Sequence, residues 1–264
     1  DASVVFSLRD IFETNNAVIR VRRDSDNTEQ DFTATEIIDG TLLAFVGAGN
    51  GFVSTWYDQK NSNNSINIIS TEQPRIVNNG VLITDGGKPS INFDSGIKRL
   101  AFNQVITGTS PRSMFFVNKP VSTNNSAGIN CLISLNDTIS NAGEAYRISR
   151  EPNDLRLRVE GCSGFSYPTG QVATDYNILT NIWTNGGTQD AEFWSNGVVM
   201  PYSSATSVNL NTAVGDGKHY IGWYDASSVS LVNHNIQEVI IFDTDQSANR
   251  IQIETDINNY YNIY

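Results

Sequence analysis

Apolar and polar residues alternate along most of this chain with the two-residue period of a β-strand. β-branched and aromatic side chains are concentrated in the alternating stretches, and clusters of Gly, Asn, Asp and Ser separate them. Such clusters are typical of the turns between consecutive strands. The pattern predicts strands at residues 17–23, 52–57, 90–93, 113–117, 131–135, 146–149, 155–160, 177–184, 191–195, 219–223 and 237–242.

Local signals add one hairpin and two helices to these strands. The Asn-Gly pair at 196–197 favours a two-residue type I′ turn and therefore predicts a hairpin around it. A short helix is expected near residues 40–45, and a second helix at the C-terminus, where Ser247 is a plausible N-cap. The residues on the apolar face of this second helix are Ile253, Ile257, Tyr260, Tyr261 and Tyr264.

The order of these elements indicates the architecture. The chain shows no regular alternation of strands with helices, no internal repeat and no interdomain linker, and the Asn/Ser-rich tract at 60–65 is short enough to be a surface loop. We therefore predict an all-β fold, a single β-sandwich domain over 1–264 in which two antiparallel sheets pack face to face. A chain of 264 residues can bury a substantial core without a metal or disulfide.

The two cysteines, Cys131 and Cys162, could form a disulfide or remain as thiols. The predicted meander places them near the ends of two strands that are not adjacent. Their Cα atoms would then be farther apart than the ~7 Å that a disulfide can bridge. The pattern favours two free thiols.

Composition bears on location and partners. Only 17% of the residues are charged, so the surface must consist largely of Asn, Ser, Thr and Gly, as expected of an extracellular or virion β-protein. No apolar run approaches the ~20 residues of a membrane-spanning helix. The sequence starts at Asp1 without a Met, so we expect a mature or excised piece of a longer protein.

Charge argues against nucleic acid as a partner. The net charge is −11, whereas a nucleic-acid surface requires a basic face. The one basic cluster, Arg20, Arg22 and Arg23, is followed at once by Asp24 and Asp26. These charges are expected to pair with one another.

Two short motifs combine aromatic and polar residues, WYDQ at 56–59 and WYD at 223–225. Aromatic rings stack on the apolar faces of sugars, and Asp, Asn and Gln side chains hydrogen-bond to sugar hydroxyls. Consecutive residues of a strand point to opposite faces, so one aromatic of each pair is expected to be structural. The candidate carbohydrate-binding residues are Trp56, Tyr57, Asp58, Gln59, Trp223, Tyr224 and Asp225.

Metal and histidine chemistry receive less support. The segment DSDNTEQD contains Asp24, Asp26 and Asp31, whose oxygens could bind calcium, but it lacks the glycine of an EF-hand loop and suits a hairpin turn equally well. We predict no cofactor and keep calcium at this segment as the alternative. His219 and His234 are the only histidines, and neither belongs to a recognisable catalytic or zinc motif.

The chain resembles a known structural superfamily. The segments FSLRDIF, AVIRVRRDSDNTEQDF, LLAFVGAGNGFVSTWYDQ and KPSINFD are similar to a concanavalin A-like (laminin-G-like) jelly-roll module of phage virion proteins and secreted bacterial proteins. The closing segment IQEVIIFDTDQSANRIQIETDINNYYNIY resembles the usual end of that module, a last strand followed by a docked helix. The resemblance implies a jelly-roll β-sandwich.

A more distant likeness concerns catalysis. The block VRR-SDN…WYDQ resembles the catalytic domain of glycoside hydrolase family 54 α-L-arabinofuranosidases, which use a Glu nucleophile and an Asp acid/base. The resemblance implies Asp225, in YIGWYDASS, as the acid/base. Glu160, in RLRVEGCSG, is the carboxylate nearest to the nucleophile motif. A retaining glycosidase needs its two carboxyl groups ~5–5.5 Å apart.

Three functions remain open. The first is a non-catalytic, lectin-like recognition or structural module of a virion or secreted protein, which contacts a surface glycan or polysaccharide. The second is a glycoside hydrolase that uses Glu160 and Asp225. The third is a ligand-free architectural virion subunit, whose partners are other virion or cell-surface subunits.

Overall fold

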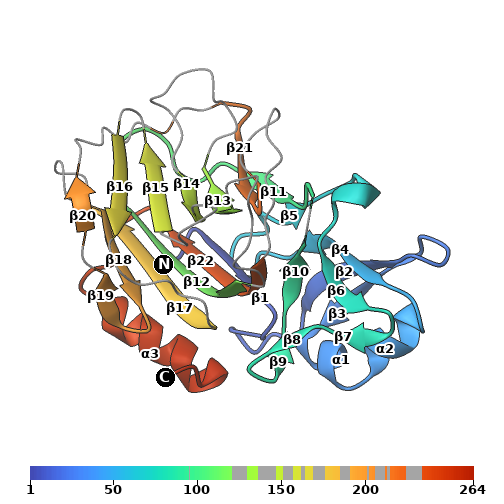
Figure 1. Cartoon of the computed structure of the whole chain (residues 1–264). Helices are drawn as coiled ribbons and strands as arrows, with labels where there is room; N and C mark the ends of the chain where they lie inside the picture. Colours follow the sequence, from blue (N-terminus) through green and yellow to red (C-terminus); the bar gives the residue numbers. More distant parts are fainter. Residues whose placement is uncertain are drawn as a thin grey trace.

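A computed structural model describes the chain except residues 95, 121–129, 136–146, 151–156, 162–163, 169–175, 185–190, 201, 206–211, 213–214 and 224–233. The backbone alone is described at residues 130, 147–150, 157–161, 164–168, 191 and 202–205. Two layers of antiparallel strands form a sandwich, and a smaller N-terminal unit adjoins one edge of it (Figure 1). The predicted all-β class, the antiparallel sheets and the C-terminal helix are confirmed.

The first sheet is centred on two long strands, β12 (Arg112–Pro120) and β22 (His234–Phe242), which pair along almost their whole length. Strands β1 and β10 share the other edge of β22, and β17, β18 and β19 continue the sheet beyond β12. Its strands are β1 (Val4–Ser7), β10 (Ile91–Phe93), β22 (His234–Phe242), β12 (Arg112–Pro120), β17 (Asn177–Trp183), β18 (Ala191–Ser195) and β19 (Val198–Met200).

The second sheet lies across the core from the first. The hydrogen-bonded neighbours, in spatial order, are β11 (Leu100–Asn103), β21 (Lys218–Ile221), β13 (Asn130–Ser134), β14 (Arg147–Arg150), β15 (Leu157–Gly161), β16 (Gly164–Pro168) and β20 (Tyr202–Ala205).

The N-terminal unit connects the two sheets at one edge. One end of β4 pairs with β6, which continues through β10 into the first sheet, and the other end pairs with β5, which continues through β11 into the second. The two layers are therefore one continuous hydrogen-bonded ladder, which the sequence did not predict. The elements of this unit are β2 (Ala17–Arg23), β3 (Glu29–Thr33), α1 (Ala34–Ile38), α2 (Thr41–Val46), β4 (Gly51–Trp56), β5 (Ser65–Ile66), the 3₁₀ turn η1 (Ser70–Glu72), β6 (Arg75–Asn78) and β7 (Val81–Leu82).

Two apolar clusters explain why β12 and β22 are buried on both faces. On the inner face, Met114 and Val239 contribute to the main core between the sheets, which extends into the N-terminal unit. On the outer face, Phe115 and Ile240 pack beneath helix α3 (Arg250–Tyr261). Because α3 covers the outer face of the first sheet, apolar side chains occupy both faces of these strands where the helix packs.

Local details agree with some predictions and correct others. The hairpin β18–β19 turns at Asn196 and Gly197, which have positive φ values of 51° and 76°, as a type I′ turn requires. The N-cap of α3 is Asn249 and not Ser247, whose hydroxyl instead donates to Asp245. Cys131 is buried, and Cys162 lies outside the described residues, so the thiol state remains a prediction.

Helix α1 was not predicted, although the sequence carries a signal for it. Thr33 and Glu36 form a capping box, in which the Thr33 hydroxyl accepts from the Glu36 N–H at 3.2 Å and the Glu36 carboxylate accepts from the Thr33 N–H at 2.8 Å. Thr and Glu at this three-residue spacing are a known start signal of helices.

Candidate functional site

Strand geometry separates the two aromatics of the WYDQ motif. Trp56 has no exposed surface and packs on Phe6, with 5.9 Å between the ring centroids. Tyr57 follows the end of β4, is half-buried, and donates its hydroxyl to Asp31 at 2.7 Å. Trp56 is a core residue that no ligand can reach, and Tyr57 is the aromatic that the motif presents outward.

Asp58 organises the loop that follows. Its Oδ1 accepts from the N–H groups of Val5 and Lys60, and its Oδ2 accepts from those of Asn61 and Asn63, at distances of 2.9–3.1 Å. The residue is 7% exposed. Its carboxylate therefore ties the 58–63 loop to β1 and is not offered to a ligand.

Gln59 has a similar internal role. Its Oε1 accepts from the Ile11 N–H at 3.0 Å, and its Nε2 donates to the carbonyl oxygens of Ser7 and Arg9 at 3.0 and 2.8 Å. The side-chain amide thus replaces backbone partners for the segment after β1. Asp58 and Gln59 position the loops around Tyr57. On the sequence alone they were instead candidate carbohydrate-binding residues.

A polar pocket lies beside Tyr57, and we call it the Tyr57 pocket. Its cavity volume is about 350 Å³, near the lower end of the range for small-molecule sites, ~300–1,000 Å³. The segment before β2 and the loop after β4 form its walls. The lining residues are Thr14, Asn16, Ala17, Val18, Tyr57, Asp58, Gln59, Lys60, Ser62 and Asn64.

Backbone strain is present in both walls of the Tyr57 pocket. Ser62 has a φ of 60° and Asn15, next to two lining residues, has a φ of 54°. The left-handed region is unfavourable for Ser, and such residues are enriched at ligand-binding sites. Ser62 and Asn16 are both exposed. Their polar side chains are accessible to a ligand.

The electrostatics around Tyr57 keep its ring neutral and fixed. Burial, together with the hydrogen bond to Asp31, raises the pKa of Tyr57 to about 12. The hydrogen bonds from Arg20 lower the pKa of Asp31, so this carboxylate stays charged and anchors the hydroxyl. Tyr57 therefore presents a neutral ring whose polar end is already satisfied.

The chemistry that the Tyr57 pocket offers is binding. Its lining provides a ring, hydroxyls, amides and one ammonium group, the donors and acceptors that suit a polyhydroxylated ligand. Asp58 is the one carboxylate among the lining residues, and four backbone N–H groups already occupy it. The pocket thus lacks the pair of carboxyl groups that glycoside hydrolysis needs.

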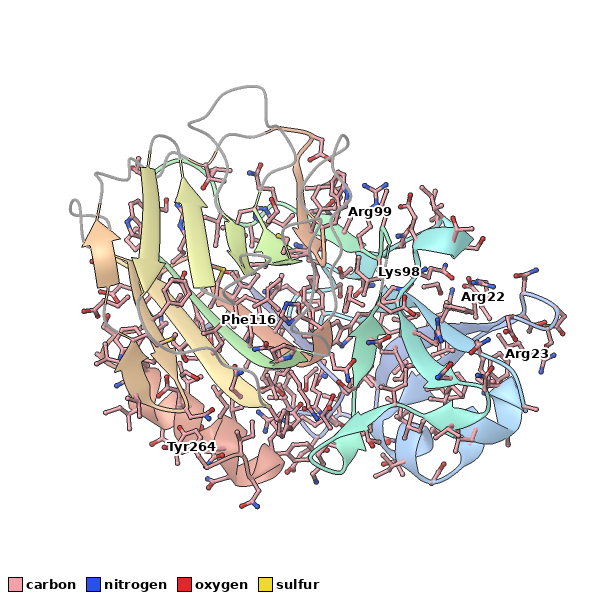
Figure 2. All side chains as sticks on the ribbon, viewed as in Figure 1. Arg22, Arg23, Lys98, Arg99, Phe116 and Tyr264 are labelled. Atoms are coloured by element: carbon pink, nitrogen blue, oxygen red, sulfur yellow. The ribbon has the colours of Figure 1, made fainter. Side chains whose placement is uncertain are left out.

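The WYD motif at 223–225 has a different environment from WYDQ. Trp223 is 4% exposed and packs edge-to-face on Tyr220 at 4.6 Å, with the Arg99 guanidinium 4.4 Å above its ring. Arg99 is ion-paired with Glu72 at 2.7 Å and lies beside Lys98 in the view of Figure 2. Trp223 is thus not an open stacking surface. Tyr224 and Asp225 lie outside the described residues, so their roles remain predictions.

The proposed catalytic carboxylates are only partly described. Glu160 is in β15, and the strand register runs from Glu160 to Arg147, then to Ser134 and Tyr220 on β21. Three strand spacings of ~4.8 Å separate Glu160 from β21, about 14 Å in all. Asp225 and the side chain of Glu160 lie outside the described residues, so their catalytic roles remain predictions.

The three carboxylates of the alternative calcium site each have another partner. Asp24 accepts from Asn50 at 2.8 Å, and Asp26 forms an ion pair with Arg23 at 2.6 Å. Asp31 pairs with Arg20 at 2.7 Å on the neighbouring strand. Within the described residues, no group of three or more His, Cys, Asp or Glu side chains could hold a metal.

The basic cluster is largely paired internally. Arg23 pairs with Asp26, as expected from the sequence, whereas Arg20 pairs with Asp31 on β3 and Asp24 accepts from Asn50. Arg22 is buried and donates to Gln73 and Asn27, while its guanidinium lies 4.9 Å from the centre of the Phe52 ring. Figure 2 shows Arg22 and Arg23 together in the N-terminal unit.

In the described part of the chain, no helix is both long and apolar enough to cross a membrane.

Comparison with known proteins gives structural but not sequence relatives. No family model and no curated protein matches the chain. A GH54 α-L-arabinofuranosidase has a TM-score of 0.64 at 12% identity, covering 96% of this chain and 62% of that chain. An arabinofuranosidase complexed with arabinofuranosyl-α-1,2-xylobiose gives a TM-score of 0.66 at the same identity and coverage.

Two further solved structures share the fold less closely. The binding domain of Paraclostridial Mosquitocidal Protein 1 has a TM-score of 0.54 at 13% identity, covering 93% of this chain and 52% of that chain. Trypanosoma rangeli sialidase has a TM-score of 0.52 at 10% identity, covering 75% and 30%. This chain thus spans about three fifths of the arabinofuranosidase chains. At these low sequence identities the similarity shows the fold alone, a β-sandwich.

Proposed function

We propose that this chain is a non-catalytic carbohydrate-recognition module that binds a glycan in the Tyr57 pocket. The observation that carries the proposal is the lining of that pocket, an outward-facing tyrosine ring surrounded by exposed Thr, Asn, Ser and Lys side chains. Such a lining matches the stacking and hydroxyl contacts of a sugar. Support also comes from the fold, which is shared with arabinofuranosidases, a sialidase and the binding domain of a mosquitocidal protein.

The proposal extends to partners and location. A surface rich in Asn, Ser, Thr and Gly suits an extracellular or virion setting, in which a surface glycan or polysaccharide is the partner. Other virion or cell-surface subunits are the second kind of partner in this proposal.

Binding is tested with a glycan array followed by titration of the best ligand. Tyr57→Ala should weaken binding about tenfold or more, because stacking on an aromatic ring is lost. Tyr57→Phe should retain most of the affinity, since the ring stays and only the hydroxyl bond to Asp31 is removed. Tyr264→Ala is the matched control, because Tyr264 is 54% exposed and lies at the C-terminus, outside the lining of the pocket.

The outcomes on the array distinguish binding in the Tyr57 pocket from binding elsewhere and from an architectural function. Glycan binding that is lost in Tyr57→Ala and kept in Tyr264→Ala supports the proposal. Binding that survives Tyr57→Ala would move the site elsewhere on the molecule, and no binding on the array would favour the architectural function.

A glycoside hydrolase is the second candidate, and the similarity to GH54 α-L-arabinofuranosidases favours it. Incubation with 4-nitrophenyl α-L-arabinofuranoside decides between the two. Our proposal predicts no release of nitrophenol above background. Turnover that Glu160→Gln and Asp225→Asn both abolish, with circular dichroism unchanged, would establish the hydrolase instead.

A further inference from the structure

Three side chains meet on the outer face of the first sheet, away from the Tyr57 pocket. Lys119 on β12 and Asn235 on β22 are direct cross-strand partners, so their Cβ atoms are ~4.5–5.5 Å apart. Asp85 lies against both side chains. Its Oδ1 is 3.2 Å from the Lys119 ammonium, and its Oδ2 accepts from the Asn235 amide at 2.7 Å. Asp85 and Asn235 are buried, whereas Lys119 is partly exposed.

The amide of Asn235 is also held from its other side. Asn92 on β10 is its cross-strand partner there, and the Asn92 Nδ2 donates to the Asn235 Oδ1 at 2.7 Å. This bond polarises the amide carbonyl and would stabilise negative charge that develops on its oxygen. Asn235 thus has a donor on its oxygen, a carboxylate on its nitrogen and Lys119 as its partner on the adjacent strand.

Asp85 is held in position by the hairpin that carries it, formed by β8 (Thr84–Asp85) and β9 (Lys88–Pro89). The Gln237 Nε2 lies 2.8–3.2 Å from three carbonyl oxygens of this hairpin. The turn needs glycine because Gly86 and Gly87 both have positive φ. A Cβ on Gly86 would also lie 2.5 Å from the Tyr176 ring. The carboxylate is therefore fixed between its two partners.

We propose that Lys119 and Asn235 form an intramolecular isopeptide bond, with Asp85 as the group that transfers the proton. The three roles of an intramolecular acyl transfer are filled: Asp85, the proton shuttle, contacts both the amine nucleophile and the activated amide, and these two belong to directly paired residues of adjacent strands. Holding the reacting groups together on adjacent strands replaces the entropy cost of a bimolecular reaction.

The bond changes balance without an additional reactant. Asp85 takes a proton from the Lys119 ammonium, and the free amine attacks the Asn235 Cγ. The Nζ–Cγ bond forms, the Cγ–Nδ2 bond breaks, and Asp85 returns the proton to the departing nitrogen, which leaves as ammonia. The products are one secondary amide between the side chains and one ammonia molecule, which takes up the remaining proton as ammonium.

The bond would join the two longest paired strands of the first sheet. It would close the whole segment between residues 119 and 235 into a covalent loop. As with a disulfide, closing a long loop restricts the unfolded chain and raises stability. The cross-link is independent of the glycan-binding function proposed above.

Intact mass spectrometry of the purified, folded chain tests the proposal. The expected mass is that of the sequence minus one ammonia, and digestion should yield one branched peptide that contains both Lys119 and Asn235. Lys119→Arg keeps the positive charge beside Asp85 but cannot form the bond, so it should show the full sequence mass. Lys98→Arg is the matched control, because Lys98 is a lysine that donates to the Thr71 carbonyl oxygen and contacts no carboxylate in the described structure.

Two results would overturn the proposal. The first is a wild-type chain that keeps its full mass even after prolonged incubation above neutral pH, where more of the amine is unprotonated. The second is a mass loss that persists in Lys119→Arg, which would assign it to another reaction such as cyclisation at Asn196-Gly197. The peptide map distinguishes these, because a cyclised asparagine yields no branched peptide.

Discussion

Single polar side chains complete the hydrogen bonds of buried backbone at several points of this protein. Asp58 does so for the loop after β4, and His219 does so inside the sandwich. The His219 Nε2 accepts from the N–H groups of Val105 and Ile106 at 3.0 and 3.2 Å, and its Nδ1 lies 2.6 Å from the Leu135 carbonyl oxygen. These contacts require a neutral ring with its proton on Nδ1. An unsatisfied buried N–H would cost ~1–3 kcal/mol.

The buried histidine predicts acid sensitivity. Burial, reinforced by the charge of Arg112, lowers the pKa of His219 to about 3 in the folded protein. In the unfolded chain the ring has the ordinary histidine pKa of about 6.5, so the unfolded state binds the proton first as pH falls. This contribution to stability is complete above pH 6.5 and is lost between pH 6.5 and about 3, up to about 5 kcal/mol in total.

Urea denaturation between neutral pH and about pH 4 measures this loss. The dependence of the unfolding free energy on pH should be shallower in His219→Gln by about one proton. If this variant does not fold, the ring resonances of His219 in the wild type provide the test, since they should not titrate in this range. Titration near the ordinary pKa of histidine would contradict the burial argument.

At the scale of elements, a buried ion pair docks helix α3 on the first sheet. Glu238 on β22 has no exposed surface and accepts from Arg9 through Nε at 2.7 Å and Nη2 at 2.9 Å. The Ser7 hydroxyl donates to the same carboxylate at 2.6 Å, and Tyr261 of α3 lies 3.2 Å from it. The Arg9 guanidinium also lies 5.2 Å from the centre of the Tyr260 ring. The segment after β1, the last strand and the C-terminal helix therefore depend on one charge pair.

Removing one partner of this pair should be costly. Arg9→Met leaves the Glu238 carboxylate buried without its counter-charge, which typically costs ~3–5 kcal/mol. We expect a large drop in the unfolding free energy and faster proteolysis at α3. The double variant Arg9→Met/Glu238→Gln should recover part of the loss, because the buried charge is gone.

An exposed ion pair provides the control. Arg20 and Asp31 have side chains that are 43% and 42% exposed, so Arg20→Met should cost less than ~1 kcal/mol. Denaturation curves of the two single variants give the comparison. Similar losses at both positions would show that burial of the Arg9 pair contributes little.

At the scale of the whole molecule, one apolar core extends from the N-terminal unit through the sandwich. The cluster contains Leu42 of α2, Val53 of β4 and Leu179 of β17, all without exposed surface. The hydrogen-bonded ladder is continuous across the same boundary through β4. Among the residues that the structure describes, neither the core nor the ladder has a break at which the N-terminal unit could unfold alone.

We therefore predict a single cooperative unfolding transition, which also tests the one-domain prediction. Leu42→Ala and Leu179→Ala remove the same side chain from the two ends of the core, at an expected cost of ~2–5 kcal/mol each. Both variants should shift one transition, with fluorescence and circular dichroism curves coinciding. Two separate transitions in Leu42→Ala would show that the N-terminal unit is an independent domain.

Local sequence signals were enough to predict the features that local chemistry controls. Two-residue alternation identified most long strands, including residues 17–23 and 191–195 with the bounds that the structure shows. The Asn196-Gly197 pair determined a hairpin because few residues tolerate two positive φ values in succession. The short strand at Val4–Ser7 was missed, because an apolar run of that length does not distinguish strand from helix.

Which polar and aromatic residues face a ligand depends on the packing of elements that are distant along the chain. Trp56 and Tyr57 are equivalent in the sequence, yet the first is in the core and the second borders the pocket. The orientation depends on which face of β4 meets Phe6, a residue about fifty positions away. Lys119, Asp85 and Asn235 likewise become neighbours only when two strands and a hairpin assemble. Sequence patterns report periodicity within an element, whereas sites form between elements that are distant along the chain.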